Sequence, residues 1–257
     1  MTAELAGKSV LITGANRGIG LGVAERFLKA GADVTISALE ADVTDIAADL
    51  TRRFDREVNG IVCDICEADQ IAALKDAAGT VDVLINNAGF EYITPIADPS
   101  PHVDETFHRV IMTNVVGTFS VTRALLGKIP DGGRIINTAS MWGKTAVAEF
   151  SAYCASKHAV IGLTRSLAQE LAPRRISVNA VCPGWVRTLA SMRSLRFMAT
   201  RENRTEADML DEIVAAQALP GLMEPPDMAA MYLFLAGSAA DNITGQSFTV
   251  DRGELMQ

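Results

Sequence analysis

The chain has 257 residues, which suits one large α/β domain, and its 49% hydrophobic residues supply a sizeable core. A formal net charge of −8 argues against nucleic acid as the main partner, because phosphate binding needs a basic surface. No run of 18 apolar residues predicts a membrane span, and residues 1–8 lack the apolar segment of a secretory signal. We therefore expect a cytoplasmic protein with no membrane or nucleic-acid partner.

Short apolar runs alternate with longer segments of helical periodicity along the whole chain. The runs are continuously apolar, as in strands that are buried on both faces. This alternation predicts an α/β fold with a Rossmann-like, doubly wound, seven-stranded parallel sheet. No linker or repeat interrupts it, so one domain is predicted for residues 1–257. The predicted strands are Ser9–Thr13, Asp33–Ser37, Val58–Cys63, Val81–Asn86, Gly133–Asn137, Ile176–Val181 and Ser247–Val250.

A glycine-rich turn follows the first predicted strand and opens the first helix. The sequence Thr13–Gly20 reads TGANRGIG. Its glycines allow a tight turn and a close approach of a pyrophosphate to the backbone, and the helix N-terminus offers free N–H groups. A structural turn also uses glycine, but the position at the first strand–helix junction favours dinucleotide binding.

The helical segments are bounded by clear signals. Ile19, Val23, Phe27 and Leu28 fall on one face of the first helix, and Ala30-Gly31 is a typical stop. A long helix is predicted for Tyr153–Leu171, closed by Pro173.

The least regular segments, Phe90–Pro101 and Arg187–Glu206, are candidate substrate walls, because ligands of such sheets bind beyond the carboxyl ends of the strands.

The cysteines and histidines do not predict a metal site. Cys63 and Cys66 form a CxxC motif, but the chain has no second pair, so packing at a strand end is favoured over a redox or zinc role. The three histidines lack metal-ligand spacing. We expect no metal.

Several motifs, taken in order, resemble the short-chain dehydrogenase/reductase family. The glycine turn has the family's TGxxxGxG spacing rather than the usual GxGxxG. The other matching positions are Asn86–Gly89 (NNAG), Asn114, Ser140, Tyr153 and Lys157 (YxxxK), Asn179, Pro183-Gly184 and Thr188. The resemblance implies an enzyme that moves a hydride between a nicotinamide cofactor and a carbonyl or secondary alcohol.

Tyr153 and Lys157 are four residues apart on a predicted helix, so they share a face. A free phenol has a pKa of roughly 10. A nearby ammonium and the positive charge of an oxidised nicotinamide favour the phenolate, so Tyr153 could act as general acid/base. Ser140 would hold the substrate oxygen. By resemblance, Lys157 would also bind the nicotinamide ribose, and Asn114 would hold a water that links Lys157 to solvent.

The resemblance also implies a set of cofactor-binding residues. Asp64 would contact adenine, whereas Asn87 is either a cofactor contact or a satisfied turn amide. Asp251-Arg252-Gly253 departs from the family's usual glycine pair, which leaves the C-terminal contact open. The implied set is Gly14, Asn16, Arg17, Gly18, Ile19, Gly20, Asp64, Ile65, Asn87, Ala88, Gly89, Tyr153, Lys157, Pro183, Gly184, Val186 and Thr188.

The end of the second strand bears on the choice of cofactor. An acid at Ala38 would bind a ribose 2′-hydroxyl and repel a 2′-phosphate, and none is present. Arg17 could reach such a phosphate. Two residues favour NAD(H) instead. Leu39 stands where a second arginine often stands in members that prefer NADP(H), and Glu40 lies close by. NADP(H) is slightly favoured over NAD(H).

The substrate is expected to be a small molecule with a carbonyl or alcohol group. Met141, Trp142 and Trp185 suggest an apolar pocket, and residues of about 187–216 would form a lid. Five arginines and one acid lie between Arg187 and Arg204, which suggests either an anion clamp or, more simply, a solvated surface.

The predicted helix Tyr153–Leu171 carries more apolar positions than one sheet face needs, which together with the family resemblance predicts a homotetramer. The alternative function is a non-catalytic dinucleotide-binding sensor or scaffold. An intact set of Asn114, Ser140, Tyr153 and Lys157 argues against it.

Overall fold

A computed structural model describes residues 5–256, so the first four residues of the N-terminal segment lie outside it. Its strands form one seven-stranded parallel sheet in the order β3-β2-β1-β4-β5-β6-β7. This is the predicted Rossmann-like, doubly wound α/β fold. The strands are β1 (Ser9–Thr13), β2 (Asp33–Ala38), β3 (Val58–Val62), β4 (Val83–Asn86), β5 (Arg134–Thr138), β6 (Ser177–Pro183) and β7 (Ser247–Val250).

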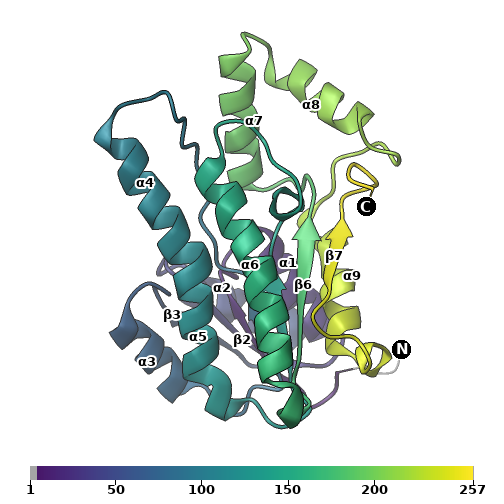
Figure 1. The fold of residues 1–257 in the computed structure, drawn as a ribbon. Coiled ribbons are helices and arrows are strands. Elements are labelled where there is room, and N and C mark those ends of the chain that lie inside the picture. The colour runs from purple at the N-terminus through teal and green to yellow at the C-terminus, as the bar shows by residue number, and fades with distance from the viewer. Residues whose placement is uncertain (1–4, 257) are drawn as a thin grey trace.

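Helices cover both faces of the sheet (Figure 1). On one face lie α4 (Pro101–Ile111), α5 (Thr118–Leu125) and α6 (Ser151–Glu170), with α3 (Ala68–Ala77) toward the edge. On the other lie α1 (Gly18–Lys29), α2 (Val43–Phe54) and α9 (Pro225–Ala236). The remaining helices are α7 (Leu189–Arg201) and α8 (Glu206–Ala215), a π-helical turn η1 (Met112–Gly117), and 3₁₀ turns η2 (Leu126–Lys128), η3 (Met141–Gly143), η4 (Ala172–Arg174) and η5 (Ser238–Ala240).

The two faces of the sheet enclose two apolar cores. Successive side chains of β1 alternate between them, since Val10 and Ile12 pack with α1 and α9, whereas Leu11 packs on the α5 and α6 side. Phe27 on α1 and Tyr232 on α9 are completely buried in the first core. The predicted apolar face of the first helix is therefore confirmed.

Strand ends differ from the sequence-based ranges by one or two residues, and backbone pairing explains the shifts. Val81 was predicted to start a strand, but its N–H is donated to the Lys128 carbonyl outside the sheet, so β4 starts at Val83. Conversely, β6 continues to Pro183 because Pro183 pairs in register with Val250. The long helix α6 begins at Ser151, one half-turn before the predicted start.

Residues 101–128 form one helical stretch that is long and apolar enough, by length and composition, to cross a membrane. This is weak evidence, because the core helix of a soluble domain meets the same criteria. In this chain Val121 and Leu125 of the stretch are buried in the core beside the sheet.

The helices α7 and α8 stand above the carboxyl ends of β6 and β7 (Figure 1). They occupy most of the segment 187–216 that was predicted as a lid. The sheet edge beneath them is where the site residues gather.

Candidate active site

A cleft of about 1170 Å³ opens at the carboxyl ends of the central strands, bordered by the loops that follow β1 to β6 and by the start of α7. All the predicted site residues line it except Gly20 and Asn114. Residues predicted from motifs along nearly 180 positions are thus brought to one edge of the sheet.

The glycine turn is shaped for close backbone contact. Gly14 and Gly18 have φ angles of +63° and +57°, which favour glycine. A Cβ atom on Gly14 would lie 2.6 Å from the Ala88 Cα, and one on Gly20 would lie 2.3 Å from the Gly14 carbonyl oxygen. No acid stands in the first turn of α1, so its N–H groups and dipole fit the pyrophosphate of a dinucleotide.

Thr13 and Asn87 tie this turn to the neighbouring strand β4. The Thr13 hydroxyl accepts hydrogen bonds from the N–H groups of Asn87 and Ala88, both at 3.1 Å. The Asn87 side-chain amide donates to the carbonyls of Thr13 (3.1 Å) and Gly14 (2.9 Å). Of the two interpretations left open for Asn87, these contacts support the satisfied turn amide, although the residue also lines the cleft.

Charged and polar side chains meet where β2 ends. Arg17 forms an ion pair with Glu40. The Asn16 amide donates to Asp42 at 2.8 Å and to Glu40 at 3.3 Å. Asp42 was missed in the sequence because it lies four positions beyond Ala38, at the N-cap of α2.

Tyr153 and Lys157 project from α6 into the cleft. The Lys157 side chain is almost fully buried and donates from Nζ to the Thr138 carbonyl at 2.8 Å, 5.5 Å from the Tyr153 ring centroid. Burial lowers the pKa of Lys157 to about 8, and Glu91 partly opposes this effect.

The surroundings of the Tyr153 phenol favour its protonated form. Burial raises its pKa, and the charge of Glu91 raises it further, while hydrogen bonding with the Ser140 side chain lowers it. The Ser140 hydroxyl also accepts from the Trp142 N–H at 3.2 Å. Together these effects favour the neutral phenol over the phenolate.

Asn114 lies in the π-helical turn η1, outside the cleft lining. Its side chain donates to the Phe90 carbonyl and to the Ser156 hydroxyl, both at 2.9 Å, and accepts from the Phe90 N–H at 2.7 Å. A Cβ atom on Gly89 would lie 3.3 Å from Asn114 Oδ1 and 3.5 Å from Lys157 Nζ. Asn114 thus fixes the loop after β4 beside Lys157, and its role in holding a water stays a prediction.

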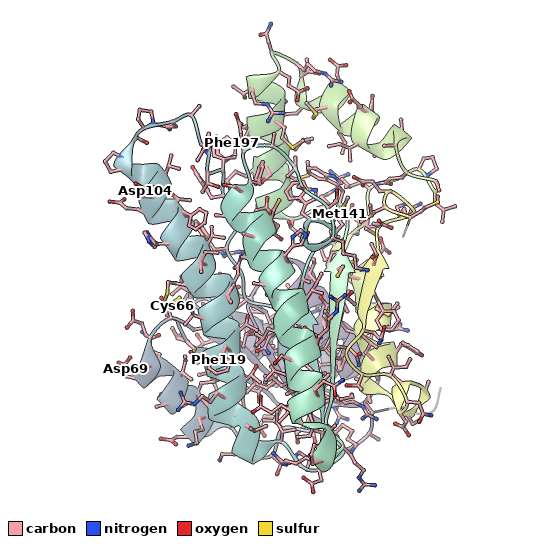
Figure 2. The ribbon with its side chains drawn as sticks, in the orientation of Figure 1. Cys66, Asp69, Asp104, Phe119, Met141 and Phe197 are labelled. Carbon is pink, nitrogen blue, oxygen red and sulfur yellow. The ribbon has the colours of Figure 1, made fainter. Side chains whose placement is uncertain are left out.

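Aromatic side chains form the wall beside Tyr153. The Trp142 ring lies 6.0 Å from the Tyr153 ring and 5.8 Å from the Trp185 ring, both in edge-on geometry. Met141 lies below the two lid helices, as Figure 2 shows. A second cavity of about 300 Å³ lies behind Met141, Trp142 and Trp185.

The lid arginines are already engaged. Arg193 donates to the Glu91 backbone carbonyl at 2.5 Å and stacks on Tyr92, 5.2 Å from the ring centroid. The other four form ion pairs: Arg187 with Glu224, Arg196 with Glu206, Arg201 with Glu149 and Glu202, and Arg204 with Glu202 and Glu212. These pairs favour the simpler of the two interpretations, a charged surface.

The segment predicted as a lid is also anchored at both ends. Thr188 caps α7 by accepting from the Ser191 N–H at 3.1 Å. At the other end, Arg252 donates from Nε to the Leu219 carbonyl at 2.6 Å. Asp251 is buried and accepts from the N–H groups of Gly253 and Leu255. The atypical Asp251–Gly253 segment therefore holds the chain that returns from the lid and does not line the cleft.

Glu91 was missed by the sequence analysis. It lines the cleft from the loop after β4, and its carboxylate accepts a hydrogen bond from the Ser194 hydroxyl on α7. Burial raises the pKa of the Glu91 carboxyl, while Ser194, Arg193 and Lys157 oppose this effect. The available signal was a lone acid between two aromatic residues, just after the NNAG motif.

The CxxC motif has a packing role in this structure. Burial raises the pKa of the Cys63 thiol to about 11, and Cys66 contacts the Thr113 hydroxyl. Asp64 accepts from the Cys66 N–H at 2.8 Å and lines the cleft. Within residues 5–256, no group of three or more His, Cys, Asp or Glu side chains is placed to hold a metal ion.

Comparison with known proteins identifies the class. The chain is 33% identical over 261 residues to a D-beta-hydroxybutyrate dehydrogenase of Cupriavidus necator, covering 98% of this chain and all of that one. Its structure is similar to a variant of actinorhodin polyketide ketoreductase with NADPH (TM-score 0.88, 34% identity, 98% of both chains). It is also similar to a short-chain type dehydrogenase/reductase from Mycobacterium marinum (TM-score 0.86, 32% identity, 99% of this chain and 98% of that one).

The fold, the cleft and these relatives define an NAD(P)-dependent oxidoreductase that interconverts a carbonyl and a secondary alcohol. A family model described as enoyl-(acyl carrier protein) reductase matches residues 14–254, and the chain belongs to the short-chain dehydrogenase/reductase family. The relatives are oxidoreductases, so they do not support the alternative of a non-catalytic sensor.

We expect Asn114→Leu to lower the free energy of unfolding by about 2–4 kcal/mol, because it leaves the Phe90 N–H and C=O without their side-chain partner. Urea unfolding measures this. Val116→Ala, at a half-exposed position in the same turn, is the control and should change stability by less than about 1 kcal/mol. Equal stability of Asn114→Leu and the natural chain would contradict the loop-anchoring role.

Proposed function

We propose that Tyr153 is the general acid/base of this enzyme, with Ser140 and Lys157 as its partners. The observation that carries the proposal is the buried Lys157 ammonium next to the Tyr153 phenol at the floor of the cleft. An ammonium this close to a phenol can stabilise the phenolate that forms when the phenol gives up its proton.

In the reductive direction the Tyr153 hydroxyl gives its proton to the substrate oxygen. The Ser140 hydroxyl donates a hydrogen bond to the same oxygen and orients it. The bound nicotinamide supplies the hydride. The Lys157 ammonium stabilises the phenolate that Tyr153 leaves behind, and the Thr138 carbonyl holds that ammonium in place. In the oxidative direction each proton moves in reverse.

For the cofactor we propose NADP(H). The glycine turn and the lining residues Asn16, Arg17 and Asp64 fit a dinucleotide, and a similar structure was determined with NADPH. Arg17 is the cation within the turn and could pair with a 2′-phosphate by two hydrogen bonds. Glu40 now holds Arg17, so binding of the phosphate must displace this exposed ion pair, which costs little.

For the substrate we propose a neutral ketone with an apolar or aromatic substituent. Met141, Trp142 and Trp185 supply an apolar wall beside Tyr153. The lid arginines have partners within the chain, so they do not offer an empty anion clamp. The segment of about 187–216 would close over this substrate and exclude water.

We also propose a cytoplasmic homotetramer. The helix α6 does not offer the surplus apolar face that its sequence predicts, because Val160 and Leu167 are buried within the chain itself. Four large apolar side chains that remain half-exposed lie together on the neighbouring stretch α4–η1–α5, at Phe107, Met112, Val116 and Phe119. This face is the better candidate for contact between copies.

We expect Tyr153→Phe to lower kcat by at least about a thousandfold while the cofactor dissociation constant changes less than about threefold, because only the transferable proton is lost. Steady-state kinetics with a ketone and titration of cofactor fluorescence measure the two quantities. Tyr92→Phe removes a phenol hydroxyl from outside the cleft lining and should keep most of the activity. Near-normal turnover by Tyr153→Phe would overturn the proposed mechanism.

We expect kcat/KM for ketone reduction to be constant at neutral pH and to fall as the pH rises through about 8. Burial lowers the pKa of Lys157 to about 8, so the ammonium is present below this pH and is lost above it. Without that charge the developing Tyr153 phenolate is no longer stabilised. A pH–rate profile from pH 6 to 10 measures the effect, and a flat profile would contradict the role of Lys157.

We expect Arg17→Ala to lower kcat/KM for NADPH by about tenfold or more and to leave the value for NADH within about threefold. Glu40→Gln should raise the NADPH preference severalfold, because it frees Arg17 and removes a repulsive charge. Arg26→Ala, on the exposed side of α1, is the control. A clear preference of the natural chain for NADH would overturn the cofactor proposal.

A further inference from the structure

Glu91 is an acidic residue of the cleft that the proposed chemistry does not use. It comes from the loop after β4 and lines the same cleft as Tyr153 and Lys157. Its charge raises the pKa of both Tyr153 and Lys157, so it lies close enough to act on both groups. A carboxylate costs free energy when it is removed from water, so its place beside a catalytic pair needs a physical reason.

The Glu91 side chain is fixed from the lid side. Oε1 accepts the hydrogen bond of the buried Ser194 hydroxyl on α7. The backbone carbonyl of Glu91 accepts from Arg193 at 2.5 Å, and Arg193 stacks on Tyr92. The loop after β4 and the helix α7 therefore hold this carboxylate in one position.

The second carboxylate oxygen of Glu91 remains available. In the described part of the chain, Oε2 has no hydrogen-bond partner, and it is not among the buried polar atoms that lack one. Oε2 is therefore not fully buried, and Glu91 is one of the residues that line the cleft. A fixed acceptor in the same cleft as Tyr153 can take a hydrogen bond from a bound molecule without losing side-chain freedom on binding.

We propose that Glu91 determines substrate specificity by accepting a hydrogen bond from a hydroxyl group on the carbon next to the substrate carbonyl. The substrate class is thus a neutral α-hydroxy ketone, or the vicinal diol in the reverse direction. This inference rests on the proposed carbonyl–alcohol chemistry and adds the group that the site recognises beside the reacting carbon.

The same carboxylate selects against acids. A substrate carboxylate at that carbon would stand next to Glu91, and two such charges at close range force one of them to take up a proton. The lid arginines do not relieve this repulsion, because Arg193 is bound to the Glu91 backbone and Arg196 is paired with Glu206. A ketone without the hydroxyl is also disfavoured, because its binding leaves the Glu91 carboxylate without a hydrogen-bond donor.

The kinetic test uses three ketones with the same phenyl group: 2-hydroxyacetophenone, propiophenone and benzoylformate. The first two differ by a hydroxyl against a methyl group, and the third carries a carboxylate. In the natural chain we expect kcat/KM to be at least about tenfold higher for the hydroxy ketone than for propiophenone, mainly through KM, with benzoylformate the poorest.

Three variants distinguish recognition of the substrate hydroxyl by Glu91 from a purely structural role of this residue. Glu91→Leu should reduce the hydroxy-ketone preference by about tenfold or more. Glu91→Gln keeps an acceptor oxygen but loses the charge, so it should retain the preference within about threefold and gain benzoylformate turnover by about tenfold. Ser194→Ala breaks only the contact with the lid and should keep the order of the three substrates. An unchanged preference in Glu91→Leu, or no gain for benzoylformate in Glu91→Gln, would overturn the proposal.

A binding measurement tests the role of Glu91 without requiring turnover. The chain has two tryptophans, Trp142 and Trp185, and both line the cleft, so their fluorescence reports its occupancy. Titration of the protein with 1-phenyl-1,2-ethanediol and with 1-phenyl-1-propanol should show tighter binding of the diol, and Glu91→Leu should abolish the difference. If no ketone is turned over, the proposed function fails, whereas equal binding of the two alcohols overturns the role of Glu91.

Discussion

The site depends on the reversal of strand order at β1 and β4. From β1 the chain builds one half of the sheet toward β3, and from β4 it builds the other half toward β7, so the loops after β1 and β4 diverge and leave a crevice. Thr13 and Asn87 bridge these loops with four hydrogen bonds of 2.9–3.1 Å. The bridge sets the glycine turn directly beside Ala88, and only a glycine at position 14 tolerates that distance.

A buried ammonium gives the site its electrostatic character. Lys157 has one backbone partner, the Thr138 carbonyl, and its remaining stabilisation comes from nearby charge. Glu91 stabilises the ammonium but disfavours the Tyr153 phenolate, so the acid pulls the two catalytic groups toward their protonated forms together. In the free enzyme this balance favours the state that donates a proton, which is the state that carbonyl reduction requires.

Local signals in the sequence were enough for the fold and for most of the cleft. Strand periodicity and the glycine turn depend on neighbouring residues, and Tyr153 and Lys157 share a face at a fixed helical spacing. The side-chain pairings were not predictable in this way. Glu91 and Ser194 are 103 positions apart, and Asn16 and Asp42 are 26 apart, so only the folded sheet brings them together. Strand ends shifted for the same reason, since Val81 is bound by Lys128 from a distant turn.

The contact between Glu91 and Ser194 joins the proposed specificity residue to the helix α7. The Ser194 hydroxyl donates a hydrogen bond to the Glu91 carboxyl, so α7 helps to position this group. Asn114 fixes the loop after β4 from the opposite side through the Phe90 backbone. The acid is thus supported by a rigid helix below and by a lid helix above.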